Sequence, residues 1–98
     1  MASIIIKIAP HDLKREMYGD KTLPLIQDNL SRYFSYPHIN VSVDGEDAAE
    51  EAFDLTNNPS RQTEREEKYG TGPSVSVGDV VEVDGVNYAC LSFGWQVL

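Results

Sequence analysis

The first clear hydrophobic pattern in the chain is a run of isoleucine over residues 4–8, which predicts a β-strand. Ile4, Ile6 and Ile8 would share one face of this strand, and Ile5 adds an apolar side chain to the other. A strand that is apolar on nearly both sides is typical of the centre of a sheet, where both faces are covered. We therefore expect these residues to form a central strand.

Two later segments have the spacing of amphipathic helices. Thr22 can cap the first, residues 22–35, and Pro37 ends it because the residue before a proline disfavours helical geometry. Asp44 can cap the second, residues 44–55, which has a thin apolar side. The first helix would bury a single stripe made of Leu23, Ile26, Leu30, Tyr33 and Phe34.

Residues 38–43 alternate between polar and apolar positions, which predicts a half-buried strand between the two helices. Ile39, Val41 and Val43 would face the core. The connection from the first strand is long enough to permit parallel pairing of the two strands.

Asp84-Gly85 lies between two valine-rich runs and is typical of a β-hairpin with a two-residue turn. Such a turn fixes the register of the two strands. The pairs expected to lie opposite each other are Val83 with Val86, Glu82 with Asn87, Val81 with Tyr88, and Asp79 with Cys90.

Together these elements predict a single α+β domain over residues 1–98. Its N-terminal part would run strand, helix, strand, helix. Residues 59–73 balance their charges and would form an exposed linker or helix end. Residues 74–98 would form an antiparallel three-stranded meander, whose last strand follows a turn at residues 92–94.

Composition narrows the classes of function. The chain has 98 residues and a formal net charge of −8, which opposes direct binding to nucleic acid or to an anionic membrane. No apolar run approaches the ~20 residues of a membrane-spanning helix. The first residues do not have the pattern of a secretory signal. Since Cys90 is the single cysteine, we expect a reducing, cytoplasmic location.

The excess negative charge is concentrated in residues 41–58, which hold six acidic and no basic side chains. One interpretation is a capped helix face that is simply solvated. The other is a DNA mimic, whose carboxylates imitate a line of phosphates and occupy the basic groove of a nucleic-acid-binding protein. The candidate partner-binding residues are Asp44, Glu46, Asp47, Glu50, Glu51 and Asp54, with Phe93 and Trp95 as a second, aromatic patch.

The sequence offers little for catalysis. Cys90 with His11 or His38 is the sole thiol candidate, and its place inside a predicted strand favours a small buried hydrophobe. The carboxylates of residues 44–54 lack the spacing of a calcium loop, and one cysteine with two separated histidines does not match a zinc site. We therefore expect a protein that is not an enzyme, with no catalytic residue, no metal and no cofactor.

The C-terminal half of the chain carries a resemblance. Residues 52–59 (AFDLTNNP), residues 72–81 (GPSVSVGDVV) and the SFGW of residues 92–95 resemble small proteins of bacteriophages and other mobile elements. They are also similar to the C-terminal portion of YodL-like domains, which have a Ser-x-Ser-Val-x-Asp-Val-Val strand, a hairpin and a closing aromatic turn. Gly78 stands between the valine and the aspartate here. The resemblance covers roughly residues 52–98 and implies no catalytic residue.

The resemblance implies a phage protein that acts in a host bacterial cell. We expect an inhibitor of anti-CRISPR or anti-restriction type that blocks a host nucleic-acid-handling defence complex by steric and electrostatic occlusion. Its partner would be a host protein or nucleoprotein complex, without direct contact to nucleic acid or membrane. The alternative is a structural or assembly protein that forms a homo-oligomer through the hairpin edge and the C-terminal aromatics.

Overall fold

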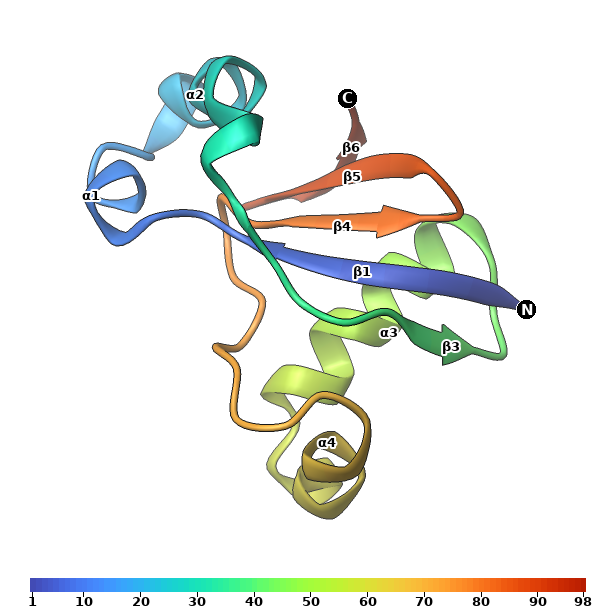
Figure 1. The fold of residues 1–98 in the computed structure, drawn as a ribbon. Helices are drawn as coiled ribbons and strands as arrows, with labels where there is room; N and C mark the ends of the chain where they lie inside the picture. The colour runs from blue at the N-terminus through green and yellow to red at the C-terminus, as the bar shows by residue number, and fades with distance from the viewer.

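A computed structural model describes residues 1–98 and arranges six strands in one sheet (Figure 1). The strand order is β2-β1-β4-β5-β6, and β3 pairs with β1 beside β2. Three 3₁₀ segments cover residues 19–21, 30–32 and 59–61. The bounds are β1 (Ala2–Ile8), α1 (His11–Lys14), α2 (Thr22–Asn29), β2 (Phe34–Ser35), β3 (Ile39–Val41), α3 (Gly45–Asn57), α4 (Gln62–Lys68), β4 (Val80–Val83), β5 (Val86–Leu91) and β6 (Gly94–Val97).

The α+β class and the C-terminal meander β4-β5-β6 are confirmed, and β1 is a central strand as predicted. The expectation of parallel pairing between the first two long strands is wrong, because β3 runs antiparallel to β1 with Ile4 opposite Ile39. The helices α1 and α2 lie beyond the end of β1 rather than along its length (Figure 1). The chain therefore re-enters the sheet where β1 stops, with Ile8 opposite Phe34, and runs back along it.

One face of the sheet packs against α3. This helix presents alanines to the strands at Ala48, Ala49 and Ala52, and all three are fully buried. Small side chains allow the helix to approach the sheet closely, so the larger strand residues fill the space between the two layers. The strand side chains in this core are Ala2, Ile4, Ile6, Ile8, Ile39, Val41, Val81, Val83 and Cys90.

The other face carries a smaller core beneath α1 and α2. Leu13 and Ile26 pack there against the strand residues Val80, Ala89 and Leu91. Helices therefore cover both faces of the sheet near β4 and β5, and these strands are buried on both sides. The elements thus form three layers, with the sheet in the middle.

The helix predicted over residues 22–35 is shorter in the structure. It loses helical geometry at Asn29, which adopts φ −125° and ψ 12°, and continues as a 3₁₀ turn. Phe34 was expected on the buried stripe, but it lies in β2 and is 60% exposed. Thr22 is buried inside the helix instead of capping it, because the cap position belongs to Lys21. Pairing with β1 overrides the local helical pattern at the end of this segment.

The C-terminal hairpin has the predicted register. Asp84 and Gly85 both adopt positive φ, 46° and 88°, as a type I′ turn requires. Val83 lies opposite Val86, and the pairing continues to Val80 opposite Ala89. Asp79 lies opposite Cys90 just beyond the ladder: the Cys90 amide donates a 2.9 Å hydrogen bond to the Asp79 carbonyl, and the Cys90 carbonyl accepts from the Gly78 amide.

The side chain of Asp79 is completely buried and joins three parts of the fold. Its Oδ1 atom accepts a 2.9 Å hydrogen bond from the Ala9 amide, where the chain leaves β1. Its Oδ2 atom accepts from the Lys14 ammonium of α1 at 2.6 Å and from the Ser76 amide at 2.8 Å. A buried carboxylate is stable only when it is paired and hydrogen-bonded, and here both oxygens are.

The hydroxyl of Tyr33 also binds the backbone next to Asp79. Tyr33 donates a 2.6 Å hydrogen bond to the carbonyl of Gly78, and burial raises the pKa of this phenol. Gly78 adopts φ +98°, and a β-carbon there would lie 2.5 Å from the Met17 sulfur. The positive φ therefore favours glycine at this position, and any larger residue would also have to displace the Met17 side chain.

We expect Asp79→Ala to lower the free energy of unfolding by about 3 kcal/mol, since it leaves the Ala9 amide without an acceptor and Lys14 without its partner. Asp79→Asn should cost less, because the amide keeps one acceptor oxygen. Urea denaturation measures both values. Asp28→Ala is the matched control at an exposed aspartate and should stay within about 0.5 kcal/mol of the parent. Equal stability of the Asp79→Ala variant and the parent would contradict the role given to this carboxylate.

Candidate protein-binding surface

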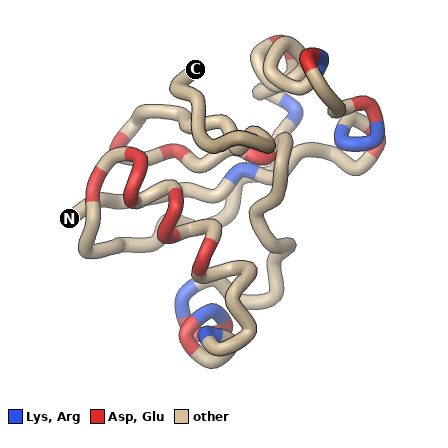
Figure 2. The backbone as a smooth tube through the Cα atoms, turned by 180° about the vertical axis from the view of Figure 1, so that it is seen from behind, with Lys and Arg blue, Asp and Glu red and all other residues tan.

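The acidic side chains predicted as a binding site lie mainly along one helix. Figure 2 shows the acidic positions of α3 following one another along its outer side. The buried residues of this helix, which include Leu55 and Thr56 as well as the three alanines, face the protein interior, and the acidic positions lie on the outer side. Glu46, Asp47, Glu50 and Asp54 are exposed, and Glu51 is half-buried. Residues three or four apart on a helix have Cβ atoms about 5–6 Å apart, so these carboxylates are close neighbours.

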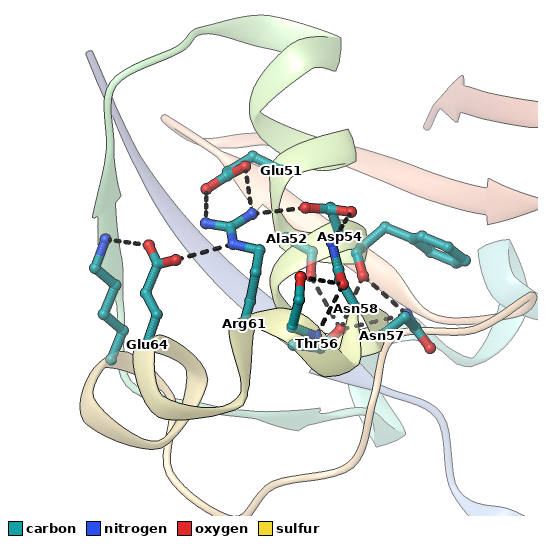
Figure 3. Close-up of polar contacts among 11 residues, drawn as sticks. Glu51, Ala52, Asp54, Thr56, Asn57, Asn58, Arg61 and Glu64 are labelled. Atoms are coloured by element: carbon teal, nitrogen blue, oxygen red, sulfur yellow. Dashed lines mark hydrogen bonds and ion pairs between the residues drawn. The ribbon is translucent and has the colours of Figure 1, made fainter.

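Two of these carboxylates form ion pairs with Arg61, whose single positive charge is shared with Glu64 (Figure 3). Its guanidinium contacts the Glu51 carboxylate at 2.7 Å and the Asp54 carboxylate at 2.8 Å, and its Nε atom contacts Glu64 at 2.9 Å. Hydrogen bonding of the guanidinium to the Glu51 carboxylate, which accepts, is the largest of the influences that raise the pKa of Arg61. Hydrogen bonds from Arg61 and Lys68 lower the pKa of Glu64 to about 2.

Residues 59–73 were predicted to form an exposed linker or helix end. In the structure they include the helix α4. Side chains at the end of α3 also bind the segment between α4 and β4. The Asn57 side-chain amide donates to the Val75 carbonyl at 2.8 Å. The Val75 amide donates in turn to the Thr56 hydroxyl at 3.0 Å. These contacts join α3 to the segment that enters β4.

Asp44 occupies the N-cap position of α3 as predicted, but its side chain makes no capping hydrogen bond. Its carboxylate lies 2.8 Å from the amino group of Met1 instead. Three of the six predicted acidic residues thus have a cationic partner within the chain. Glu46, Asp47 and Glu50 have none.

The two aromatic residues of the predicted patch have different surroundings. Phe93 is 81% exposed at the turn between β5 and β6. Trp95 is half-buried against the core, and its indole N–H donates a 2.8 Å hydrogen bond to Glu50. This contact places β6 directly beside the acidic side of α3. The structure therefore brings Trp95 and the acidic residues together, while Phe93 lies apart from them.

A second surface feature was not predicted from the sequence. An apolar groove of about 560 Å³ lies where the segment before α2 meets the turn between β5 and β6. Its lining includes Tyr18, Leu23, Val77, Leu91 and Phe93. Tyr18 and Val77 lie outside any regular hydrophobic pattern, so the sequence does not indicate that they belong to one surface. Both are exposed in the folded chain and line the same groove.

The candidate thiol is part of the core. Cys90 is 5% exposed, and burial raises the pKa of its thiol to about 11. His11 and His38 are exposed at α1 and just before β3. No group of three or more His, Cys, Asp or Glu side chains is arranged to hold a metal ion.

Comparisons with protein-family models, with curated proteins and with solved structures give no match for this chain. None of the helices combines the length and the apolar character needed to cross a membrane. The longest, α3, has 13 residues and a row of carboxylates on its outer side.

The Cys90 thiol should react slowly with iodoacetamide at pH 8, because the reactive thiolate forms only near the raised pKa of about 11. Because the pKa of the thiol is raised, the neutral thiol persists as the pH rises. The reaction rate increases only as the pH approaches that value. Mass spectrometry of the modified chain follows the rate. Addition of urea should expose the residue and restore the rate of a free cysteine. Rapid modification of the folded protein at pH 8 would contradict this placement.

Proposed function

We propose that this chain is a non-catalytic protein of a phage or mobile element that binds a host nucleic-acid-handling defence complex and inhibits it. The inhibition would be of anti-CRISPR or anti-restriction type, by steric and electrostatic occlusion of a basic groove. The contact surface would be the acidic side of α3. The resemblance of the C-terminal half to phage proteins supplies the biological setting, and the host cytoplasm is the expected location.

The observation that carries the proposal is the unpaired charge on α3. Glu46, Asp47 and Glu50 are exposed and have no cationic partner, and Glu50 lies four residues after Glu46 and three after Asp47. A row of fixed carboxylates on a rigid helix produces a local negative potential that attracts and orients a basic surface. Arg61 holds Glu51 and Asp54 in fixed positions beside this row. These two residues therefore shape the surface but contribute less free charge to it.

Replacement of the three unpaired carboxylates, Glu46→Gln, Asp47→Asn and Glu50→Gln, should weaken binding to the host complex about tenfold. Each exposed ion pair contributes about 0.2–1 kcal/mol, and three of them together approach a factor of ten. The measurement is capture of partners from nuclease-treated host lysate, followed by titration of the captured complex at two salt concentrations. The variant should also show a weaker dependence on salt.

The matched control removes three exposed carboxylates that lie elsewhere: Glu16→Gln, Asp28→Asn and Glu66→Gln. It changes the net charge by the same amount, so it separates the acidic side of α3 from a general effect of charge. Equal loss in both variants would show that only the net charge matters. Loss of every partner after nuclease treatment would contradict direct protein binding.

The second candidate function is assembly by self-association, and the exposed edge of β6 favours it. This strand ends the sheet and carries no charged side chain, and its last residue, Val97, is exposed. Light scattering between micromolar and millimolar concentrations distinguishes the two candidates. The inhibitor proposal expects a monomer throughout, because the negative charge of the chain opposes self-association. A dimer that grows with concentration would favour the assembly role.

A further inference from the structure

The free edge of β6 can accept another strand. The Leu98 amide donates to the Asn87 carbonyl of β5 at 3.0 Å, and alternate residues of an antiparallel strand face the same way. Gln96 therefore faces β5 as well, and the backbone groups of Trp95 and Val97 point outward. In agreement, the Val97 carbonyl has only a long 3.4 Å contact, from the side-chain amide of Gln96.

This edge lacks the features that usually prevent strand addition. Proteins protect sheet edges with charged residues, proline, bulges or very short strands. The opposite edge of the sheet has such protection, since β2 and β3 have two and three residues and Pro37 interrupts them. The sequence of β6 contains neither a charge nor a proline. The two edges of the sheet are therefore not equivalent.

The two faces beside β6 differ in chemistry. Gln96 projects to the face of α2, where it lines the apolar groove together with Leu23 and Phe93. Trp95 projects to the opposite face, where it contacts Glu50. Glu46 lies one helical turn before Glu50 on the same side of α3. A strand added beside β6 would thus have an apolar groove on one face and carboxylates on the other.

Residues of an added strand would project alternately to these two faces. Those opposite Trp95 and Val97 would face α3, and long basic side chains there could reach Glu50 and Glu46. Those opposite Gly94 and Gln96 would face the groove, where apolar side chains fit. Charge opposes a second copy of this chain, whose net charge is −8, and favours a basic segment.

We propose that β6 binds an extended segment of the partner protein in which basic and apolar residues alternate. Backbone hydrogen bonds to Trp95 and Val97 supply the pairing, and the alternation supplies the specificity. This inference rests on the proposed function, because it names the kind of segment that the acidic surface recognises. It adds a feature that electrostatic attraction alone does not require, namely a strand in one fixed register.

The test uses the full chain and a capped six-residue peptide that alternates Val and Lys. On titration, the amide resonances of Trp95 and Val97 should shift, and their hydrogen exchange should slow. Two control peptides separate the contributions. One has the same composition with three Val followed by three Lys, and the other alternates Val and Glu. Both should bind at least about fivefold more weakly, the loss expected for about one hydrogen bond or ion pair.

The protein variants separate backbone pairing from charge. Val97→Pro removes an outward N–H that makes no bond within the chain, and proline is tolerated on an edge strand. It should weaken binding of the alternating peptide about fivefold. Val97→Thr keeps the N–H and is the matched control. The double variant Glu46→Gln with Glu50→Gln should weaken binding by a similar factor, whereas Glu66→Gln with Glu67→Gln on α4 should leave it unchanged.

Each outcome has a distinct meaning. If the Glu46 and Glu50 variant binds less well while Val97→Pro binds as the parent does, the strand inference fails and the acidic surface stands. If Val97→Pro alone weakens binding, the basic character of the segment is overturned. If hydrogen exchange at Trp95 slows with protein concentration in the absence of peptide, a second copy occupies the edge and the inference is overturned. Weaker binding by both variants, with both controls unchanged, supports it.

Discussion

The burial of one charged carboxylate is the constraint on which the rest of this fold depends. Asp79 has no contact with solvent, so each of its carboxylate oxygens must accept a hydrogen bond from a donor within the chain. The donors come from the end of β1, from α1 and from the turn at Ser76. Meeting that requirement sets where the chain leaves the central strand. It thereby sets where α1 and α2 can cover the second face of the sheet.

Ion pairing within the chain also decides which acidic residues at the surface remain without a cationic partner. The same helix presents carboxylates that form ion pairs with Arg61 and carboxylates that do not. Glu51 and Asp54 bind Arg61 just before α4, while Glu50, one helical turn after Glu46, contacts Trp95 of β6. The free charge is therefore next to the open strand edge rather than spread over the helix. Backbone pairing and electrostatic attraction can then act on the same bound segment.

Local patterns in the sequence predicted the parts of the fold that depend on local rules. The Asp84-Gly85 turn fixes its register by backbone conformation alone, and the alternating strands need only one covered face. Phe34 was placed wrongly because its pairing with Ile8 is a contact between distant residues, which a helical stripe cannot reveal. The pairing of Arg61 with α3 and the apolar groove depend on tertiary packing in the same way. Of the candidate site, the sequence predicted the acidic row but not its division into paired and unpaired residues.

The topology of β1 has a consequence for how the protein forms in the cell. One side of this strand pairs with β2 and β3 early in the chain, but the other side pairs with β4, and the Ala9–Asp79 hydrogen bond spans 70 positions. A chain emerging from the ribosome therefore carries an isoleucine strand with one open edge until the C-terminal hairpin is made. Such open edges promote aggregation of partly folded chains. The yield of native protein thus depends on how quickly the hairpin closes onto β1.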